Sequence, residues 1–93
     1  MPSAAAYIFQ TTTFIHKGVT YDAVAYQEPN DSRLFVTTLN DGQPVLITYP
    51  DGFKATLVYF VDPTTAVDFQ QATGNSAVDA LMETAEGDIK RLV

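Results

Sequence analysis

Two Asp-Gly pairs, Asp41-Gly42 and Asp51-Gly52, stand ten residues apart and are the first candidates for a chemical role. Loop aspartates could bind calcium, but a loop of the EF-hand kind needs acidic or amide ligands at alternate positions and a closing Glu. The stretches "DGQPVLITY" and "DGFKATLVY" supply neither. Asp-Gly is also typical of tight turns, in which glycine adopts positive φ. The pattern therefore predicts two turns rather than a cation site.

The other candidates for catalysis or metal binding lack partners. His16 is the only histidine and there is no cysteine, so we expect no metal site of the usual His and Cys composition. Ser3, Ser32 and Ser76 fall in a predicted tail, loop and helix cap rather than beside a base. No glycine-rich loop precedes a predicted helix, which disfavours a phosphate site. We therefore expect no enzymatic activity, no cofactor and no metal.

The charge of the chain is acidic and uneven. The sequence contains 11 Asp and Glu against 5 Lys and Arg, a formal net charge of -6. Direct binding of DNA or RNA is disfavoured, because it depends on cations that displace counterions from phosphates. In the acidic C-terminal third, Asp79, Glu83 and Glu86 are spaced to share one face of a helix. This face either keeps the protein soluble or binds a basic protein partner.

Length and composition indicate one globular domain that covers residues 1–93. A chain of 93 residues has room for a single core, and 46% hydrophobic residues are enough to fill it. No stretch is long and apolar enough to span a membrane, and "MPSAAAYIF" lacks the basic start and the apolar stretch of a signal peptide. We therefore expect a cytoplasmic protein that makes no membrane contact.

The elements that must position these residues change type near residue 62. Between residues 7 and 61, Thr, Val, Ile, Tyr and Phe dominate, and the breaks fall at Gly, Pro, Asn and Asp. This composition is typical of strands separated by turns. Five strands are expected, namely "YIFQTTTFI", "VTYDAVAYQ", "RLFVTTL", "VLITY" and residues 53–61.

Two helices are expected after the strands. Asp62 suits an N-cap, Pro63 the first helical position, and Gly74 the residue just past the end of the first helix. Ser76 suits the N-cap of the second helix, with Asp79 at capping-box spacing. The second helix carries one apolar stripe at helical spacing, formed by Val78, Leu81, Met82, Ala85, Ile89 and Leu92.

Five strands followed by two helices predict an α+β domain, in which a five-stranded antiparallel meander sheet carries both helices on one face. A small β-barrel with a C-terminal helix is the alternative. In the fifth strand, one set of alternating side chains is apolar and is expected to meet the helices: Phe53, Ala55, Leu57, Tyr59 and Val61. The opposite set is expected on the helix-free face and is still apolar in its second half: Lys54, Thr56, Val58 and Phe60.

A sheet with two apolar faces predicts a partner, because an exposed apolar face gains free energy when it is covered. Two functions are consistent with the sequence. The first is a non-enzymatic interaction module that forms a homodimer through the helix-free face around Val58 and Phe60. The second is an acidic inhibitor or adaptor, of the kind that phages and mobile elements encode, which binds a basic, nucleic-acid-handling protein.

Overall fold

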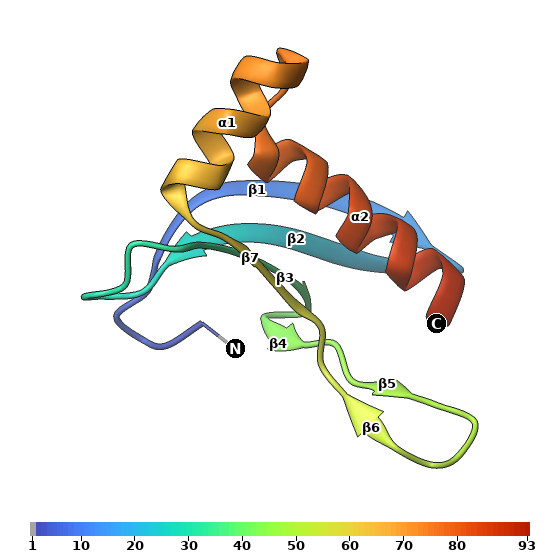
Figure 1. Ribbon diagram of the computed structural model, residues 1–93. Helices are drawn as coiled ribbons and strands as arrows, with labels where there is room; N and C mark the ends of the chain where they lie inside the picture. Colours follow the sequence, from blue (N-terminus) through green and yellow to red (C-terminus); the bar gives the residue numbers. More distant parts are fainter. Residues whose placement is uncertain (1) are drawn as a thin grey trace.

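The computed structural model describes residues 2–93 and contains a main antiparallel sheet, a separate two-stranded sheet and two helices (Figure 1). The predicted α+β class is confirmed. The barrel alternative is wrong, because β1 and β7 lie at opposite edges of an open sheet. In chain order the elements are β1 (Tyr7–His16), β2 (Val19–Gln27), β3 (Leu34–Asn40), β4 (Gln43–Pro44), β5 (Ile47–Thr48), β6 (Lys54–Ala55), β7 (Val58–Val61), α1 (Pro63–Thr73) and α2 (Ala77–Leu92).

Three long strands make up most of the main sheet, with β1 at one edge. β1 pairs with β2 and β2 with β3, both antiparallel, and a bulge leaves Phe9 without a partner in the first pairing. The two-residue turn Lys17-Gly18 joins β1 to β2, and both residues have positive φ (51° and 77°). Turns of this kind match the right-handed twist of the strands they connect. The turn therefore fixes the register of β1 against β2.

Two short strands share the outer edge of β3, which is a departure from a simple meander. β4 pairs with Leu39 and Asn40, whereas β7 pairs with the stretch from Leu34 to Thr37. Pro44 ends β4 after two residues, since it has no N–H to donate to the ladder. The chain then leaves the main sheet, and β5 and β6 form a projecting hairpin, at the lower right of Figure 1.

Both Asp-Gly pairs lie in turns, as predicted. Asp41 and Gly42 form the two-residue turn between β3 and β4, and both have positive φ (52° and 77°). In the turn between β5 and β6, the Gly52 N–H donates to the Tyr49 carbonyl (2.9 Å). The Asp51 carboxylate accepts from the N–H of Phe53 (2.9 Å). Each aspartate thus has a role in the local backbone.

The helix boundaries follow the predicted caps. The Asp62 carboxylate accepts from the N–H of Thr65 (2.8 Å), and α1 ends at Gly74, whose φ is 75°. The Ser76 hydroxyl accepts from the N–H of Asp79 (3.3 Å) at the start of α2. Because these caps satisfy backbone groups that a helix end leaves free, they define where each helix begins and ends.

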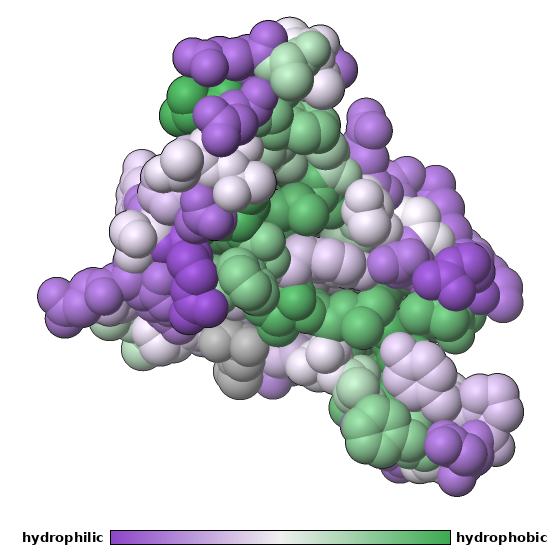
Figure 2. Space-filling model, viewed as in Figure 1, coloured by the Kyte–Doolittle hydropathy of each residue, from purple (hydrophilic) through white to green (hydrophobic). Residues whose placement is uncertain are grey.

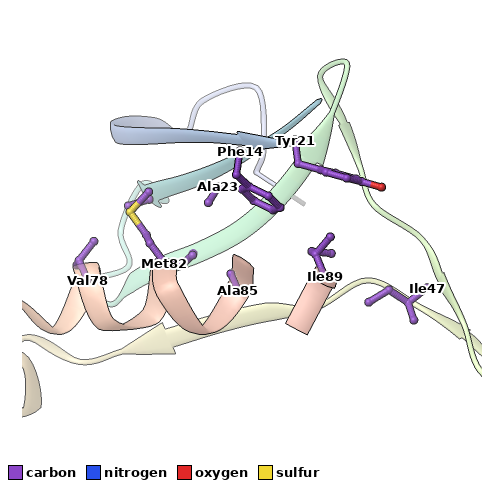
Figure 3. Packing of buried hydrophobic residues seen from close by; sticks show 10 residues of the cluster. Phe14, Tyr21, Ala23, Ile47, Val78, Met82, Ala85 and Ile89 are labelled. Carbon is purple, nitrogen blue, oxygen red and sulfur yellow. The ribbon is translucent and has the colours of Figure 1, made fainter. Parts of the chain in front are cut away.

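The core lies between α2 and one face of the main sheet (Figure 3). The buried residues of α2 are Val78, Met82, Ala85 and Ile89, all from the predicted stripe. They meet buried residues of the sheet, which include Phe14, Tyr21, Ala23, Ala25 and Val36. Both helices lie on the same side of the sheet, but α1 lies against α2 and contributes no buried residue.

The strand residues expected to face the helices divide into two groups. Leu57 and Tyr59 are half-buried and pack against the core, as predicted. Phe53 does not reach the helices, because it lies in the turn segment of the β5–β6 hairpin and is 63% exposed. The predicted fifth strand is therefore divided between β6, in the small sheet, and β7, in the main sheet.

Candidate functional site

The helix-free face of the main sheet carries an aromatic row, which consists of Tyr26, Phe35 and Phe60 and is extended by Ile8. These four residues are cross-strand partners on β1, β2, β3 and β7. Tyr26 stacks on Phe35 with 5.3 Å between ring centroids, and Phe35 contacts Phe60 at 6.2 Å. Tyr26 is buried, and this burial raises the pKa of its hydroxyl, with Glu28 adding to the effect. Phe60, at the end of the row, is 59% exposed.

Arg33 covers part of this row. Its guanidinium carbon lies 4.9 Å from the ring centroid of Phe35 and 5.0 Å from that of Phe60. The guanidinium also donates hydrogen bonds to both oxygens of the Asp31 carboxylate, Nε to Oδ1 (3.0 Å) and Nη2 to Oδ2 (2.7 Å), with a longer bond from Nε to Oδ2 (3.3 Å). These bonds lower the pKa of Asp31 to about 2. The aromatic row thus has a polar margin, held in place by cation–π contacts and a two-point ion pair.

The structure brings together two of the four residues that were predicted to mediate self-association. Val58 (40% exposed) and Phe60 (59% exposed) both lie on the helix-free face of β7. Lys54 lies in β6, opposite Thr48 in the small sheet. Thr56 lies between β6 and β7, outside any strand. The apolar half of the predicted set is therefore the part that belongs to the main sheet.

Four residues outside the predicted set complete this face: Ile8, Tyr26, Phe35 and Arg33. Ile8 and Phe35 are apolar residues in predicted strands, but only the register shows that they stand beside Tyr26 and Phe60. Arg33 precedes β3 by one residue. The signal for it is an Asp-Ser-Arg stretch just before an aromatic strand, in which a cation can reach both a carboxylate and a ring.

The predicted acidic face, formed by Asp79, Glu83 and Glu86, lies on the side of α2 next to β1. Together with Thr12 and Met82, the three acids line an open hollow of about 250 Å³. The Asp79 carboxylate accepts from Nε2 of Gln10 (2.6 Å). In a full capping box it would instead accept from the backbone N–H of Ser76. Glu86 pairs with Nζ of Lys90 (2.8 Å). The acidic face is thus tied to β1 at one end and partly neutralised at the other.

Tyr59 and Asp88 form a titratable pair at the contact between β7 and α2. The Tyr59 hydroxyl donates to the Asp88 carboxylate, which also accepts from Nη2 of Arg91 (2.9 Å). Burial, and then this hydrogen bond, raises the pKa of Tyr59, while the two hydrogen bonds lower the pKa of Asp88. Perturbed pKa values can mark catalytic groups. The cavity beside Tyr59 has only about 10 Å³, so the pair serves the packing of α2 on β7.

The lone histidine lies at the end of the core. Nε2 of His16 hydrogen-bonds to the carbonyl oxygen of Val93 (2.9 Å) and so joins β1 to the last residue after α2. Among residues 2–93, no group of three His, Asp or Glu side chains is placed to hold a metal ion. In the same range, neither helix is long and apolar enough to cross a membrane.

Comparisons with protein-family models, with curated proteins and with solved structures find no match to this chain. The functional proposal therefore depends on two surfaces: the helix-free face with its aromatic row, and the acidic face beside β1. Figure 2, seen from the same side as Figure 1, shows apolar residues between and below the two helices and on the projecting hairpin, with hydrophilic residues around them.

Proposed function

We propose that this protein is a small, non-enzymatic interaction module that forms a homodimer through its helix-free face. The observation that carries the proposal is the exposure of Val58 and Phe60 at the end of the aromatic row. Burying a Phe side chain contributes roughly 1.5–3 kcal/mol. A two-fold arrangement covers two copies of the same patch at once, and it is the commonest closed assembly.

The distribution of charge supports a second copy as the occupant of this face. A homodimer must bring together two chains that each carry a net charge of -6. The acidic face belongs to α2, which packs on the opposite side of the main sheet. At the aromatic row, Arg33 and Asp31 neutralise one another, and Glu28 near Tyr26 is a further charge. A dimer formed there keeps the acidic faces of the two copies apart, which favours association.

The test is the mass in solution. Light scattering at micromolar concentration should give about twice 10.2 kDa for the wild type. Phe60→Asp should shift the mass toward that of a monomer while the circular dichroism spectrum stays unchanged. Phe53→Asp is a matched control, since Phe53 is similarly exposed (63%) but lies within the projecting hairpin, and it should leave the mass unchanged. A wild type that remains monomeric at high concentration would contradict the proposal.

A second candidate, an acidic adaptor for a basic protein, is favoured by the hollow beside β1. Asp79, Glu83 and Glu86 surround this hollow, and within residues 2–93 Glu83 forms no ion pair. Binding of a lysine-rich peptide should weaken as salt is added and in the variant Glu83→Gln. Asp68→Asn, an exposed charge change on α1, is the control. Equal binding by all these forms would remove the adaptor candidate.

A further inference from the structure

β1 is an unpaired edge of the main sheet. Within the part of the chain that the structure describes, β2 is the only strand that pairs with it. His16 and Val19 flank a two-residue turn, so each donates a backbone hydrogen bond to the other. Along an antiparallel ladder, such hydrogen-bonded pairs alternate with pairs that do not bond to each other. The N–H and C=O groups of Thr11, Thr13 and Ile15 therefore point away from β2. A free row of this kind can accept an additional strand.

The edge lacks the features that usually prevent pairing. Proteins protect free edges with lysine, proline, bulges or inward-pointing charges. β1 has a bulge at Phe9, but the stretch from Gln10 to Ile15 contains no charge, no proline and no bulge. Thr11, Thr12 and Thr13 are exposed, and Ile15 is 66% exposed. The unprotected stretch is about 20 Å long, which is the length of an ordinary strand.

α2 runs parallel to β1, although it packs mainly over β2 and β3. Near its start, the Asp79 carboxylate accepts from Gln10, and just after its end the Val93 carbonyl bonds to His16. The strand between these contacts is about 20 Å long and the helical stretch about 21 Å, so the two elements run side by side in one direction. Figure 1 shows α2 above β1 along this length. The acidic face consequently lies on the side of α2 nearest the outer edge, beside Thr12.

The negative charge of the acidic face favours a basic strand over a second copy of this chain as the partner of β1. If two copies of β1 paired about a two-fold axis, the acidic faces of both copies would lie near one another, and like charges would oppose the contact. A strand with Lys or Arg on its helix side would instead place cations beneath these acids. Alternate residues of a strand are about 6.8 Å apart, and Asp79 and Glu83 are separated by about 6 Å along the helix. Two basic residues at alternate positions therefore match two of the acids.

We propose that the β1 edge binds an extended segment of a basic protein by strand addition. The backbone of that segment pairs with Thr11, Thr13 and Ile15. Lysine or arginine at two alternate positions faces Asp79 and Glu83, and apolar residues on the other side lie beside Ile15. The proposal rests on the adaptor candidate for the charge of its partner. It does not depend on the homodimer, which uses the aromatic row.

The experiment uses labelled eight-residue peptides and the full chain. The probe alternates Val and Lys, so that all its charges lie on one side of a strand. The control peptide has the same composition in two blocks, four Val followed by four Lys. We expect the alternating peptide to bind at least about fivefold more tightly, the equivalent of one net backbone hydrogen bond. It should also slow the amide exchange of Thr11, Thr13 and Ile15.

Protein variants separate the backbone and charge contributions. Thr13→Pro removes an outward N–H at a sheet edge, where proline is tolerated, and should abolish the advantage of the alternating peptide. Glu83→Gln should weaken its binding about two- to fivefold, whereas Asp68→Asn should not. Phe60→Asp should bind the peptide like the wild type, because the dimer face is separate.

Two results would overturn strand addition at this edge. One is equal affinity for the alternating and the blocked peptide with no protection of the three amides, which would leave a purely electrostatic adaptor. The other is protection of these amides in the absence of peptide, together with a dimer that persists in Phe60→Asp. That result would assign the edge to a second copy. If Thr13→Pro unfolds, the peptide pair and the amide exchange still decide the question.

Discussion

Replacing Ile89 with alanine tests whether the packing of α2 holds this domain together. Ile89 is 2% exposed, and Ile47, on β5, is buried to the same extent. With Leu57 and Tyr59, these two residues surround a cavity of about 10 Å³. That volume is at the lower limit for one water molecule. Removal of most of the Ile89 side chain would therefore enlarge an existing void in an apolar environment.

The expected cost follows from this burial. Truncation of a buried Ile to Ala destabilises proteins by about 2–5 kcal/mol, and we expect about 3–5 kcal/mol here because helix and strand cannot both move in to fill the space. Ile89→Val should cost only about 0.5–1.5 kcal/mol. Leu81→Ala should cost less than Ile89→Ala, since Leu81 is only half-buried. The total free energy of unfolding of a domain of this size is about 5–15 kcal/mol, so Ile89→Ala removes a large part of its stability.

The assay is urea unfolding followed by circular dichroism. All variants should be made in the Phe60→Asp background, because a dimer would make the apparent stability depend on protein concentration. The slope of the free energy against urea should stay constant while the midpoint falls. A loss below about 1 kcal/mol for Ile89→Ala would refute the placement of α2 on the sheet through this stripe. A larger loss for Leu81→Ala would refute the deeper burial of Ile89.

Three further predictions concern the hydrogen bond between Tyr59 and Asp88, the glycines Gly42 and Gly87, and the Asp41 turn. Tyr59→Phe should lower the free energy of unfolding at pH 7 by about 1–2 kcal/mol, because Asp88 loses a donor. The pKa of Asp88 is lowered in the folded state, so its contribution to stability is present above the unfolded pKa of about 3.9 and is lost as the pH falls below it. The difference in free energy of unfolding between wild type and Tyr59→Phe should therefore shrink when unfolding is measured at successively lower pH. Thermal melts should show Gly42→Val destabilised, because the φ of Gly42 is 77°, and Gly87→Ala stabilised, because Gly87 lies inside α2 with open space around it. Asp41→Asn and added calcium should each leave the melting temperature unchanged; a rise with calcium that Asp41→Asn abolishes would restore the ligand hypothesis.

The helices could be predicted from the sequence in detail, because their signals are local. Asp62, Pro63, Gly74 and Ser76 each act on backbone groups within a few residues, and all four occupy the predicted positions. The stripe on α2 likewise depends only on helical geometry, and it forms the core as expected. The two Asp-Gly turns follow the same rule. Where a structure is decided by near neighbours, the sequence is sufficient.

The arrangement of the last strands could not be predicted, because it depends on distant pairing. Alternation of side chains continues without a break from Phe53 to Val61, so nothing in the pattern marks the change of sheet near Thr56. How β4 and β7 divide the edge of β3 between them depends on where the chain leaves the main sheet after Pro44. Phe53 was assigned to the core side by its parity alone, and the hairpin carries it away from the helices.

For the candidate surfaces too, the sequence predicted what lies within one strand or helix but not how separate elements come together. Val58 and Phe60 were found because they alternate with core residues on a single strand. Their neighbours Phe35 and Ile8 required the register of three strand pairings and the position of the bulge. The acidic face could be predicted as one side of a helix, but its position over β1 follows from contacts between residues about seventy positions apart, such as Gln10 with Asp79.

That separation in sequence has a consequence for the synthesis of the protein. The sheet residues that line the core, such as Phe14, Tyr21 and Val36, are made long before α2, which covers them. About fifty residues separate Val36 from Ile89. At about 5–20 residues per second, a ribosome needs roughly 3–10 s to add them. During this interval the nascent chain exposes apolar side chains on both faces of its sheet. The growing chain, rather than the finished protein, is therefore the form that we expect chaperones to bind.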